Sequence, residues 1–157
     1  MRVGLGIDAH RFAAGRPLVL GTIAIDHDRG LAGHSDGDVL THAIVDSILG
    51  AAALGDIGTH FPSSDPRWKD VDSSIFLSEV VASVRLLGLD IANIDATVIC
   101  EAPRLEPYRE KMQASIASAL GVEPEAVSVK ATTTDTMGFT GRGEGVAAFA
   151  VALIRPV

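Results

Sequence analysis

The sequence has few of the residues that stabilise small proteins through cross-links or large aromatic rings. Its 157 residues include one cysteine, and aromatic residues make up 4% of the chain. A single cysteine excludes an internal disulfide framework and fits a reducing compartment, the cytoplasm. Because hydrophobic residues still account for 47% of the chain, the core must consist mainly of aliphatic side chains and alanine.

Long apolar runs are also missing. No stretch approaches the ~20 uninterrupted apolar residues that a transmembrane helix needs. The amino-terminal segment reaches Asp8 and His10 before any apolar run long enough for a signal peptide. We therefore expect a soluble protein of the cytoplasm that does not interact with a membrane.

Positive charge is scarce as well. Lysine and arginine number 13 against 20 aspartates and glutamates, and the formal net charge is -7. This balance argues against a nucleic-acid partner, because no basic stripe is present to neutralise phosphates. The length suits one domain, residues 1–157, whose core needs no disulfide or structural metal.

Hydrophobic periodicity predicts strands and helices along the whole chain. Residues 2–10 alternate as a strand, with Asp8 and His10 on the same face as Gly4 and Gly6. Helices are predicted over 36–53, 73–87 and 107–120, further strands over 18–25, 91–100, 127–131 and 146–154, and irregular segments over 55–72 and 138–145. The pattern indicates a single α+β or α/β domain.

The last predicted strand carries a second message. It is apolar at every position from Val146 to Ile154, which predicts that both of its faces are buried. One face is mostly alanine. Either a closely packed helix or the sheet of another copy of the chain could cover these alanines.

A metal-binding set is the first candidate for chemistry. Asp8 and His10 share one face of a strand, and a helix that starts at Ser35 would align His42 with Asp38 and Asp46. The alternative is an ordinary solvated helix face. Together Asp8, His10 and His42 form a set of two histidines and a carboxylate. Such a set leaves one tetrahedral position of a catalytic zinc open, where the metal acts as a Lewis acid.

Other segments suit phosphates and hydroxyls. His34 and Ser35 stand at a predicted helix amino terminus, where free N–H groups favour an anion, although Ser35 is also predicted to cap that helix. Residues 130–135 end a strand in three threonines and Asp135, which could hold a hard cation such as Mg²⁺. Residues 54–58 and 61–65 suit sugar hydroxyls, or are simply turns. The glycine-rich run at 138–145 is not a Walker A loop.

In combination, these motifs are much more specific than any one of them alone. They are Asp8-Ala9-His10, His34-Ser35-Asp36-Gly37-Asp38 with His42, Ala51 through Gly58, Ala102-Pro103, Lys130 through Thr134, and Gly138 through Gly145. In this order and over the whole chain, the sequence resembles the 2-C-methyl-D-erythritol 2,4-cyclodiphosphate synthase family. The resemblance implies an α+β fold, a two-layer sandwich. Its mixed sheet has about four main strands with helices on one face, and the sheets meet around a trimer axis.

The resemblance also implies the reaction. In it, 4-diphosphocytidyl-2-C-methyl-D-erythritol 2-phosphate becomes the 2,4-cyclodiphosphate with release of CMP, a step of the non-mevalonate isoprenoid pathway. The substrate's own 2-phosphate attacks its β-phosphate. Asp8, His10 and His42 would bind Zn²⁺ or another divalent cation, and Asp135 would hold Mg²⁺ or Mn²⁺ on the substrate diphosphate. His34 and Thr133 would be the catalytic residues, which stabilise the transition state.

The substrate contacts implied by the resemblance fall into a few segments. They are Asp8, His10, His34 and Ser35; Asp56, Ile57 and Gly58; Phe61, Pro62, Ser63, Ser64 and Asp65; Cys100, Glu101, Ala102, Pro103, Arg104, Leu105 and Glu106; Thr132, Thr133, Thr134 and Asp135; and Phe139 and Arg142. The family forms homotrimers with active sites between subunits. Its central channel can hold an isoprenoid diphosphate, and Phe139 and Arg142 match residues near that channel.

The sequence departs from the family pattern at three positions. Asp135 replaces the usual Glu, Arg104 replaces the more usual Lys, and Cys100, expected to be a buried thiol, stands where small residues are common. Two other functions remain open on the residues alone. One is a metal-dependent phosphohydrolase, and the other is a non-catalytic trimer that binds an isoprenoid diphosphate.

Overall fold

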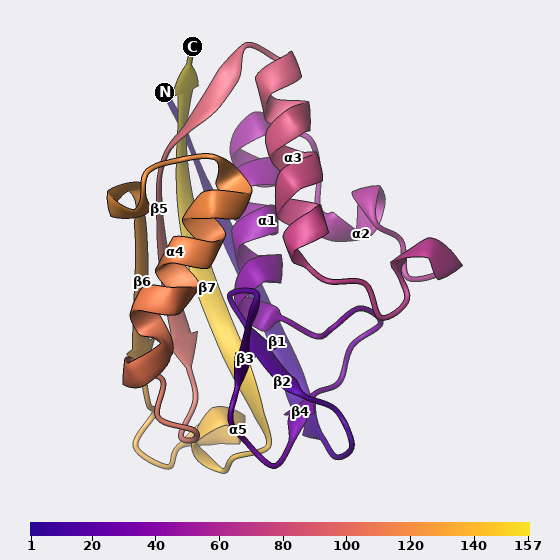
Figure 1. Ribbon diagram of the computed structural model, residues 1–157, viewed down its shortest axis with the longest axis vertical. Coiled ribbons are helices and arrows are strands. Elements are labelled where there is room, and N and C mark those ends of the chain that lie inside the picture. The colour runs from indigo at the N-terminus through magenta and orange to yellow at the C-terminus, as the bar shows by residue number, and fades with distance from the viewer.

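A five-stranded sheet with all its long helices on one face organises the chain (Figure 1). The computed structural model describes residues 1–157. Its strands are β1 (Arg2–Ala13), β2 (Leu18–Leu20), β3 (Ile23–Ile25), β4 (Gly30–Leu31), β5 (Leu89–Ile99), β6 (Val127–Thr132) and β7 (Gly145–Pro156). The sheet has the order β4-β1-β7-β5-β6, and only the β5–β6 pair is parallel. The predicted mixed sheet of four main strands is confirmed, with the two-residue β4 added at its edge.

Three long helices form the second layer. They are α1 (Val39–Ala52), α3 (Ser74–Leu86) and α4 (Arg109–Leu120). Figure 1 shows α1 lying along β1 and β7, α4 in front of β5 and β6, and α3 on α1. The buried core between the layers is aliphatic, with residues such as Leu40, Ile44 and Ile116 fully buried. No helix in the structure is long and apolar enough to cross a membrane.

Helix α1 approaches the sheet closely because β1 and β7 present very small residues to it. A Cβ atom at Gly4 would lie 2.0 Å from the carbonyl oxygen of Ser47, and one at Gly6 would lie 1.9 Å from that of Ala43. Gly4 pairs with Ala152, and Gly6 pairs with Ala150 on β7. The glycines therefore border no open space, since the helix backbone fills it.

The predicted double burial of the last strand is wrong for the single chain. Helix α1 covers the alanine face of β7, whereas Phe149 and Val151 on the opposite face are exposed. On β1 the same outer face carries exposed Val3, Leu5 and Ile7. Of the two covers considered for the alanines, the closely packed helix is the one present, and the apolar surface left uncovered lies behind the sheet.

The first helix begins later than predicted. The carboxylate of Asp38 caps α1 by accepting from the backbone N–H of Thr41, at 3.0 Å. It also accepts from the N–H groups of Gly21 and Thr22, at 2.9 and 2.7 Å. Ser35 therefore does not cap the helix, because Asp38 ties the start of α1 to the β2–β3 turn.

Three other segments differ from the predicted pattern. The extended run 18–25 is a hairpin of β2 and β3, which turns through Gly21 and Thr22 with φ angles of +57° and +63°. The irregular run 55–72 holds the short helix α2 (Ile57–His60) and a 3₁₀ turn over Pro66–Trp68. The glycine-rich run holds α5 (Gly138–Gly141).

Candidate metal centre and active site

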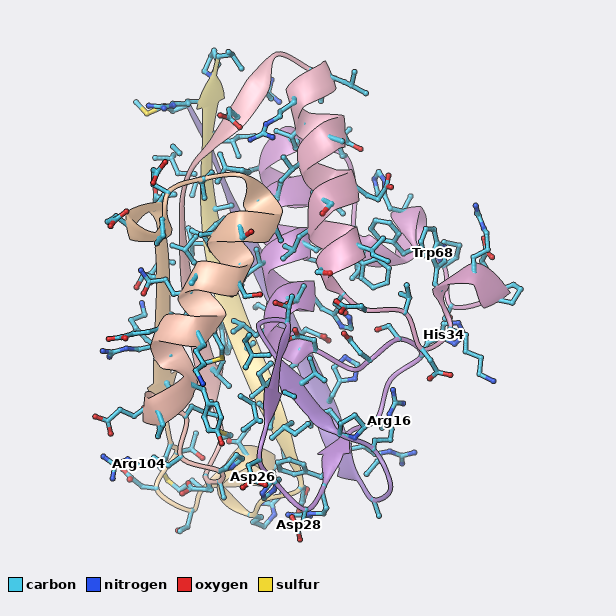
Figure 2. The ribbon with its side chains drawn as sticks, in the orientation of Figure 1. Arg16, Asp26, Asp28, His34, Trp68 and Arg104 are labelled. Carbon is cyan, nitrogen blue, oxygen red and sulfur yellow. The ribbon has the colours of Figure 1, made fainter.

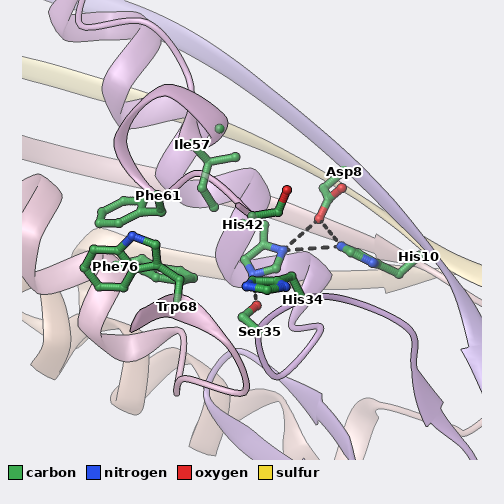
Figure 3. A pocket seen from close by; sticks show the side chains of 11 residues that line it. Asp8, His10, His34, Ser35, His42, Ile57, Phe61, Trp68 and Phe76 are labelled. Atoms are coloured by element: carbon green, nitrogen blue, oxygen red, sulfur yellow. Dashed lines mark hydrogen bonds and ion pairs between the residues drawn. The ribbon is translucent and has the colours of Figure 1, made fainter. Parts of the chain in front are cut away.

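Three side chains from two elements point at one place beside the sheet (Figure 3). Asp8 and His10 stand two residues apart on β1, and His42 lies in the first turns of α1. Asp8 Oδ2 lies 2.8 Å from His10 Nε2 and 3.0 Å from His42 Nδ1, and the two nitrogens are 3.3 Å apart. Strand alternation predicts the first two, and only the close packing of α1 on β1 adds the third.

The donor set suits a divalent metal ion. His10 Nδ1 donates to the carbonyl oxygen of Ala32, which leaves Nε2 facing the cluster. His42 Nε2 lies 3.1 Å from Ser35 Oγ and 3.0 Å from Ser73 Oγ, on the side away from the cluster. Two imidazole nitrogens and one carboxylate oxygen are the ligands of an open zinc site, with partners on the second nitrogens as metal-ligating histidines require.

The charges of the cluster support each other without a metal. Burial by itself would raise the pKa of Asp8, but hydrogen bonds and charge from His10 and His42 outweigh it and hold that pKa well below its usual range. Burial would lower the pKa of His10, and the hydrogen bond and charge of Asp8 reverse this, so it is raised. The carboxylate is therefore ionised, as a metal ligand must be.

A cavity of about 260 Å³ opens beside the cluster. Its lining combines the cluster with polar and aromatic side chains: Asp8, His10, His34, Ser35, His42, Ile57, Gly58, Phe61, Ser63, Trp68 and Phe76. Figure 3 shows the aromatic group of Phe61, Trp68 and Phe76 on one side of His42 and the ligand atoms on the other. The cavity thus offers a polar end and an apolar end to a small ligand.

The loop that carries His34 is held in place by hydrogen bonds from other segments to its backbone carbonyl groups. Arg16 Nη1 donates to the carbonyl oxygen of Gly33 at 2.6 Å, and its Nη2 donates to that of Ser35. The N–H of Asp70 donates to the carbonyl oxygen of His34 at 2.9 Å. The carbonyl groups of three consecutive residues, 33–35, therefore accept hydrogen bonds from other segments. The side chains of His34 and Ser35 line the cavity.

The comparisons with known proteins identify the family. The YgbB family matches residues 1–155. The chain belongs to the YgbB family. A 2-C-methyl-D-erythritol 2,4-cyclodiphosphate synthase of Moorella thermoacetica is 58% identical over 154 residues, which cover 98% of this chain and 94% of that protein. A protein of the same name from Salinibacter ruber is 56% identical over 155 residues, which cover 99% of each chain.

Solved structures agree with this family membership. The bifunctional IspDF of Campylobacter jejuni matches with a TM-score of 0.96 and 40% identity, over 99% of this chain and 42% of that one. IspF of Plasmodium falciparum, solved as a CDP complex, matches with a TM-score of 0.87 and 34% identity, over 99% and 96% of the two chains. The α+β fold of this YgbB-family chain is therefore the fold of those synthases.

In this YgbB-family chain, the expected substrate contacts divide between separate cavities. The metal-site cavity takes in His34, Ser35, Ile57, Gly58, Phe61 and Ser63. A second cavity of about 370 Å³ is lined by Cys100, Glu101, Pro103, Arg104, Leu105, Glu106, Ala131, Thr132 and Thr133. The two linings share no residue, and Figure 2 shows His34 and Arg104 on opposite sides of the molecule. The two expected catalytic residues, His34 and Thr133, are therefore not brought together within one chain.

The remaining expected residues lie outside both linings. Phe139 and Thr134 line an apolar hollow of about 520 Å³ with Ile7 and Phe149. Arg142 lies outside this hollow and pairs with Glu144 at 2.7 Å. Asp56, Pro62, Ser64, Asp65, Ala102 and Asp135 line none of these three cavities.

The two aspartates of the predicted helix stripe, Asp38 and Asp46, stabilise helix starts rather than line the cavity. Asp38 is the buried cap, and burial raises its pKa. Asp46 accepts from the N–H of Ile57 at 2.7 Å and so fixes the start of α2. Asp56 caps the same helix, with its carboxylate 2.8 Å from the N–H of Thr59. Of the three residues in the stripe, only His42 belongs to the group formed with Asp8 and His10.

Sequence reasoning missed four residues around the site, namely Arg16, Trp68, Ser73 and Phe76. The single tryptophan in an irregular segment was an available signal for Trp68. Phe76 lies in the helix predicted over 73–87, where an apolar residue by itself indicates only the buried face. For Arg16 and Ser73 no local pattern exists, since each contacts a segment far away in the sequence.

Proposed function

We propose that this chain is a 2-C-methyl-D-erythritol 2,4-cyclodiphosphate synthase. It converts 4-diphosphocytidyl-2-C-methyl-D-erythritol 2-phosphate to the cyclic diphosphate and CMP, with residues 1–157 acting as one domain. The observation that carries the proposal is near-full-length identity of 56–58% to synthases of that name, together with the converging Asp8, His10 and His42 side chains. The free thiol of Cys100 suits a reducing compartment and supports the cytoplasm as its location.

Zn²⁺ is the metal that we assign to Asp8, His10 and His42. A bound zinc ion would act there as a Lewis acid on a phosphate oxygen. Both reacting groups are phosphates of one substrate, so the protein needs no nucleophile of its own. The residues then serve to fold the substrate into an in-line geometry and to neutralise its charge.

The cavity residues can be assigned to parts of the substrate. His34 and Ser35, on the loop held by Arg16, would donate to phosphate oxygens. Residues 56–58 and 61–65 would surround the methylerythritol part. The hydroxyls and backbone of 132–135 and the segment 100–106 would hold the diphosphate and cytidine. Thr133 would donate to the β-phosphate as charge builds up on it.

Asp135 is the proposed ligand of a second ion, Mg²⁺ or Mn²⁺. Its exposed carboxylate has a single side-chain neighbour, Thr133 Oγ1 at 3.3 Å. Such cations prefer oxygen ligands and take several from substrate phosphates, so one carboxylate is enough on the protein side. The ion would offset the negative charge of the diphosphate.

A homotrimer with active sites between subunits completes this proposal. The metal cavity and the cavity near Thr133 lie apart in one chain, yet a single substrate must reach both. The outer sheet face supplies an apolar surface for association, with Leu5 61% and Phe149 40% exposed. The hollow at Phe139 adjoins this face, and it is the place proposed for an isoprenoid diphosphate on the trimer axis, with Arg142 nearby.

Phosphorus-31 NMR tests the reaction directly. Zinc-loaded protein is mixed with the diphosphocytidyl substrate and Mg²⁺. Two coupled cyclic diphosphate resonances that grow together with CMP support the proposal. CMP with open-chain phosphates would instead identify a phosphohydrolase. Binding of an isoprenoid diphosphate that survives removal of zinc, with no turnover, would identify a non-catalytic binding protein.

A further inference from the structure

Ser73 stands where a helix cap is expected and does not act as one. It is the residue before α3, is fully buried, and makes no capping hydrogen bond to that helix. The carboxylate of Asp72 instead accepts from the N–H of Ser74 at 2.8 Å. The Ser73 hydroxyl is directed to two other partners, Asp36 and His42.

The direction of these hydrogen bonds is fixed by chemistry. Ser73 Oγ donates to Asp36 Oδ1 at 2.5 Å, and the N–H of Ser73 donates to Asp36 Oδ2 at 2.8 Å. A carboxylate only accepts, so the single hydroxyl proton of Ser73 is committed to Asp36. Toward His42 Nε2, at 3.0 Å, Ser73 Oγ can therefore only accept.

This constraint determines which nitrogen of His42 carries its proton. Nε2 must be protonated to donate to Ser73, so Nδ1 is the nitrogen whose lone pair can be given to a metal ion; without the metal, Nδ1 can carry a proton toward Asp8. Nδ1 is the atom that faces Asp8 and His10. Ser35 Oγ lies 3.1 Å from Nε2 but has no other hydrogen-bond partner, so its proton is not committed in this way.

We propose that Asp36 and Ser73 are positioning residues that hold His42 in the tautomer able to bind the metal ion. The inference rests on the proposed metal site at Asp8, His10 and His42. Residues that fix a ligand's second nitrogen change metal affinity by about 10–100-fold in other proteins. We expect an effect on zinc affinity of the same magnitude here. Ser73 acts by accepting a hydrogen bond from His42, and Asp36 acts by accepting a hydrogen bond from the hydroxyl of Ser73.

Competition with a chelator measures the effect on the metal. Full-length zinc-loaded protein is titrated with the chelator, and the zinc dissociation constant is compared between wild type, Ser73→Ala and Asp36→Asn. The amide of Asp36→Asn has one acceptor oxygen for the two Ser73 donors, so the hold on the hydroxyl proton is weakened. Both variants should bind zinc about 10–100-fold more weakly. Ser78→Ala, which removes a hydroxyl bonded within α3 itself, should bind zinc like wild type.

Nitrogen-15 NMR reads the tautomer itself. In the zinc-stripped wild-type protein, the long-range proton–nitrogen spectrum should show His42 protonated at Nε2. In Ser73→Ala the signals should move toward a mixture of both tautomers, a change that a purely structural role for Ser73 would not produce. The wild-type spectrum decides the point even where a variant does not fold.

Different results would separate the possible failures. Unchanged zinc affinity in a folded Ser73→Ala, or His42 unprotonated at Nε2 in the wild type, overturns the role of Ser73 and Asp36 and leaves the metal site intact. Absence of zinc binding by the wild type overturns the metal site itself, and the inference with it.

Discussion

His34 and His42 line one cavity but differ in burial and in partners. His42 is 8% exposed and is hydrogen-bonded on both ring nitrogens, whereas the His34 side chain is exposed and forms no hydrogen bond with Asp8, His10 or His42. An imidazole that is anchored through one nitrogen and turns the other toward two further candidate ligands suits a metal site. An exposed imidazole at the rim suits contact with a substrate.

These differences predict separable losses. His42→Ala should lose stoichiometric zinc. His34→Ala should keep its zinc and turn over about 10²–10³-fold more slowly, the usual cost of removing one transition-state donor. Metal analysis of the purified variants and CMP release measure the two effects. Stoichiometric zinc in His42→Ala would show that the ligand assignment is wrong.

Cys100 is a buried thiol, as expected from the sequence. It is 5% exposed, and burial, with a smaller contribution from the charge of Glu101, raises its pKa to about 11. The folded state therefore holds this proton more tightly than the unfolded chain, where the pKa is near 9.0. The resulting stability is complete below pH 9 and declines as the pH rises toward 11.

Two measurements check this prediction. The free energy of unfolding should fall between pH 9 and pH 11, and it should fall less steeply in Cys100→Ala, where no thiol titrates. Alkylation of the folded protein at neutral pH should be slow and should become fast on unfolding. Rapid alkylation of the folded protein would contradict burial of the thiol.

At the scale of the elements, the contact between α1 and β1 brings the three candidate metal ligands, Asp8, His10 and His42, together. A Cβ at Gly6 would lie 1.9 Å from the carbonyl oxygen of Ala43, so a side chain there must push the helix away. Gly6→Ala should lower the free energy of unfolding by about 3 kcal/mol. It should also weaken zinc binding, because His42 moves with α1. Thermal denaturation and chelator competition measure both.

A control on the same helix separates this clash from any general effect of alanine. Nothing lies within 4 Å of a Cβ placed at Gly50, which is exposed near the end of α1. Gly50→Ala should raise the free energy of unfolding by roughly 0.5–1 kcal/mol, since alanine is the better helix former. A Gly6→Ala variant as stable as wild type would mean that the contact is looser than described.

The loop at 33–35 depends on one side chain from another segment. Arg16 donates hydrogen bonds to the carbonyl groups on both sides of His34, so removal of the Arg16 side chain should make the position of the His34 imidazole more variable. Arg16→Ala should reduce kcat about 100-fold, as small misplacements of reacting groups do. Arg16→Lys, which cannot span both carbonyls, should recover only part of it. Zinc content should not change, and wild-type kcat in Arg16→Ala would exclude this role.

Local patterns predicted the elements better than their ends. Period-two and helical spacing located the strands and helices, because burial on one face is written into neighbouring residues. The start of α1 was placed wrongly because Ser35 and Asp38 both suit a cap. Bonds to Gly21 and Thr22, distant in sequence, decide in favour of Asp38. For the same reason Ser73 could not be connected to His42 in advance.

For the whole molecule, the outer face of the sheet is apolar and exposed in the single chain, and the proposed trimer would bury it. Leu5 lies between the exposed Val3 and Ile7 on this apolar surface, so Leu5→Asp should disrupt association and lower activity with it. Sedimentation velocity measures the mass in solution. Leu86→Asp places the same charge on an exposed leucine of α3, away from this face, and should leave the assembly unchanged. An assembled Leu5→Asp protein would contradict the proposed interface.

At this scale the sequence was informative about the surface but not about its orientation. An apolar last strand predicted more burial than one domain provides. It did not show that α1 would take the alanine side and leave Phe149 and Val151 exposed. The choice depends on Gly4 and Gly6 of β1, which admit the helix backbone only on their own face. The buried face of β7 therefore depends on its pairing with β1, which the pattern of β7 alone does not contain.

The central strand of the sheet is also the last strand along the chain. β7 joins β1 to β5, so that Arg2 pairs with Ile154. During synthesis, β1 and β5 must wait with unpaired edges until residues 145–156 emerge from the ribosome. Such distant pairings form slowly and expose the nascent chain to aggregation.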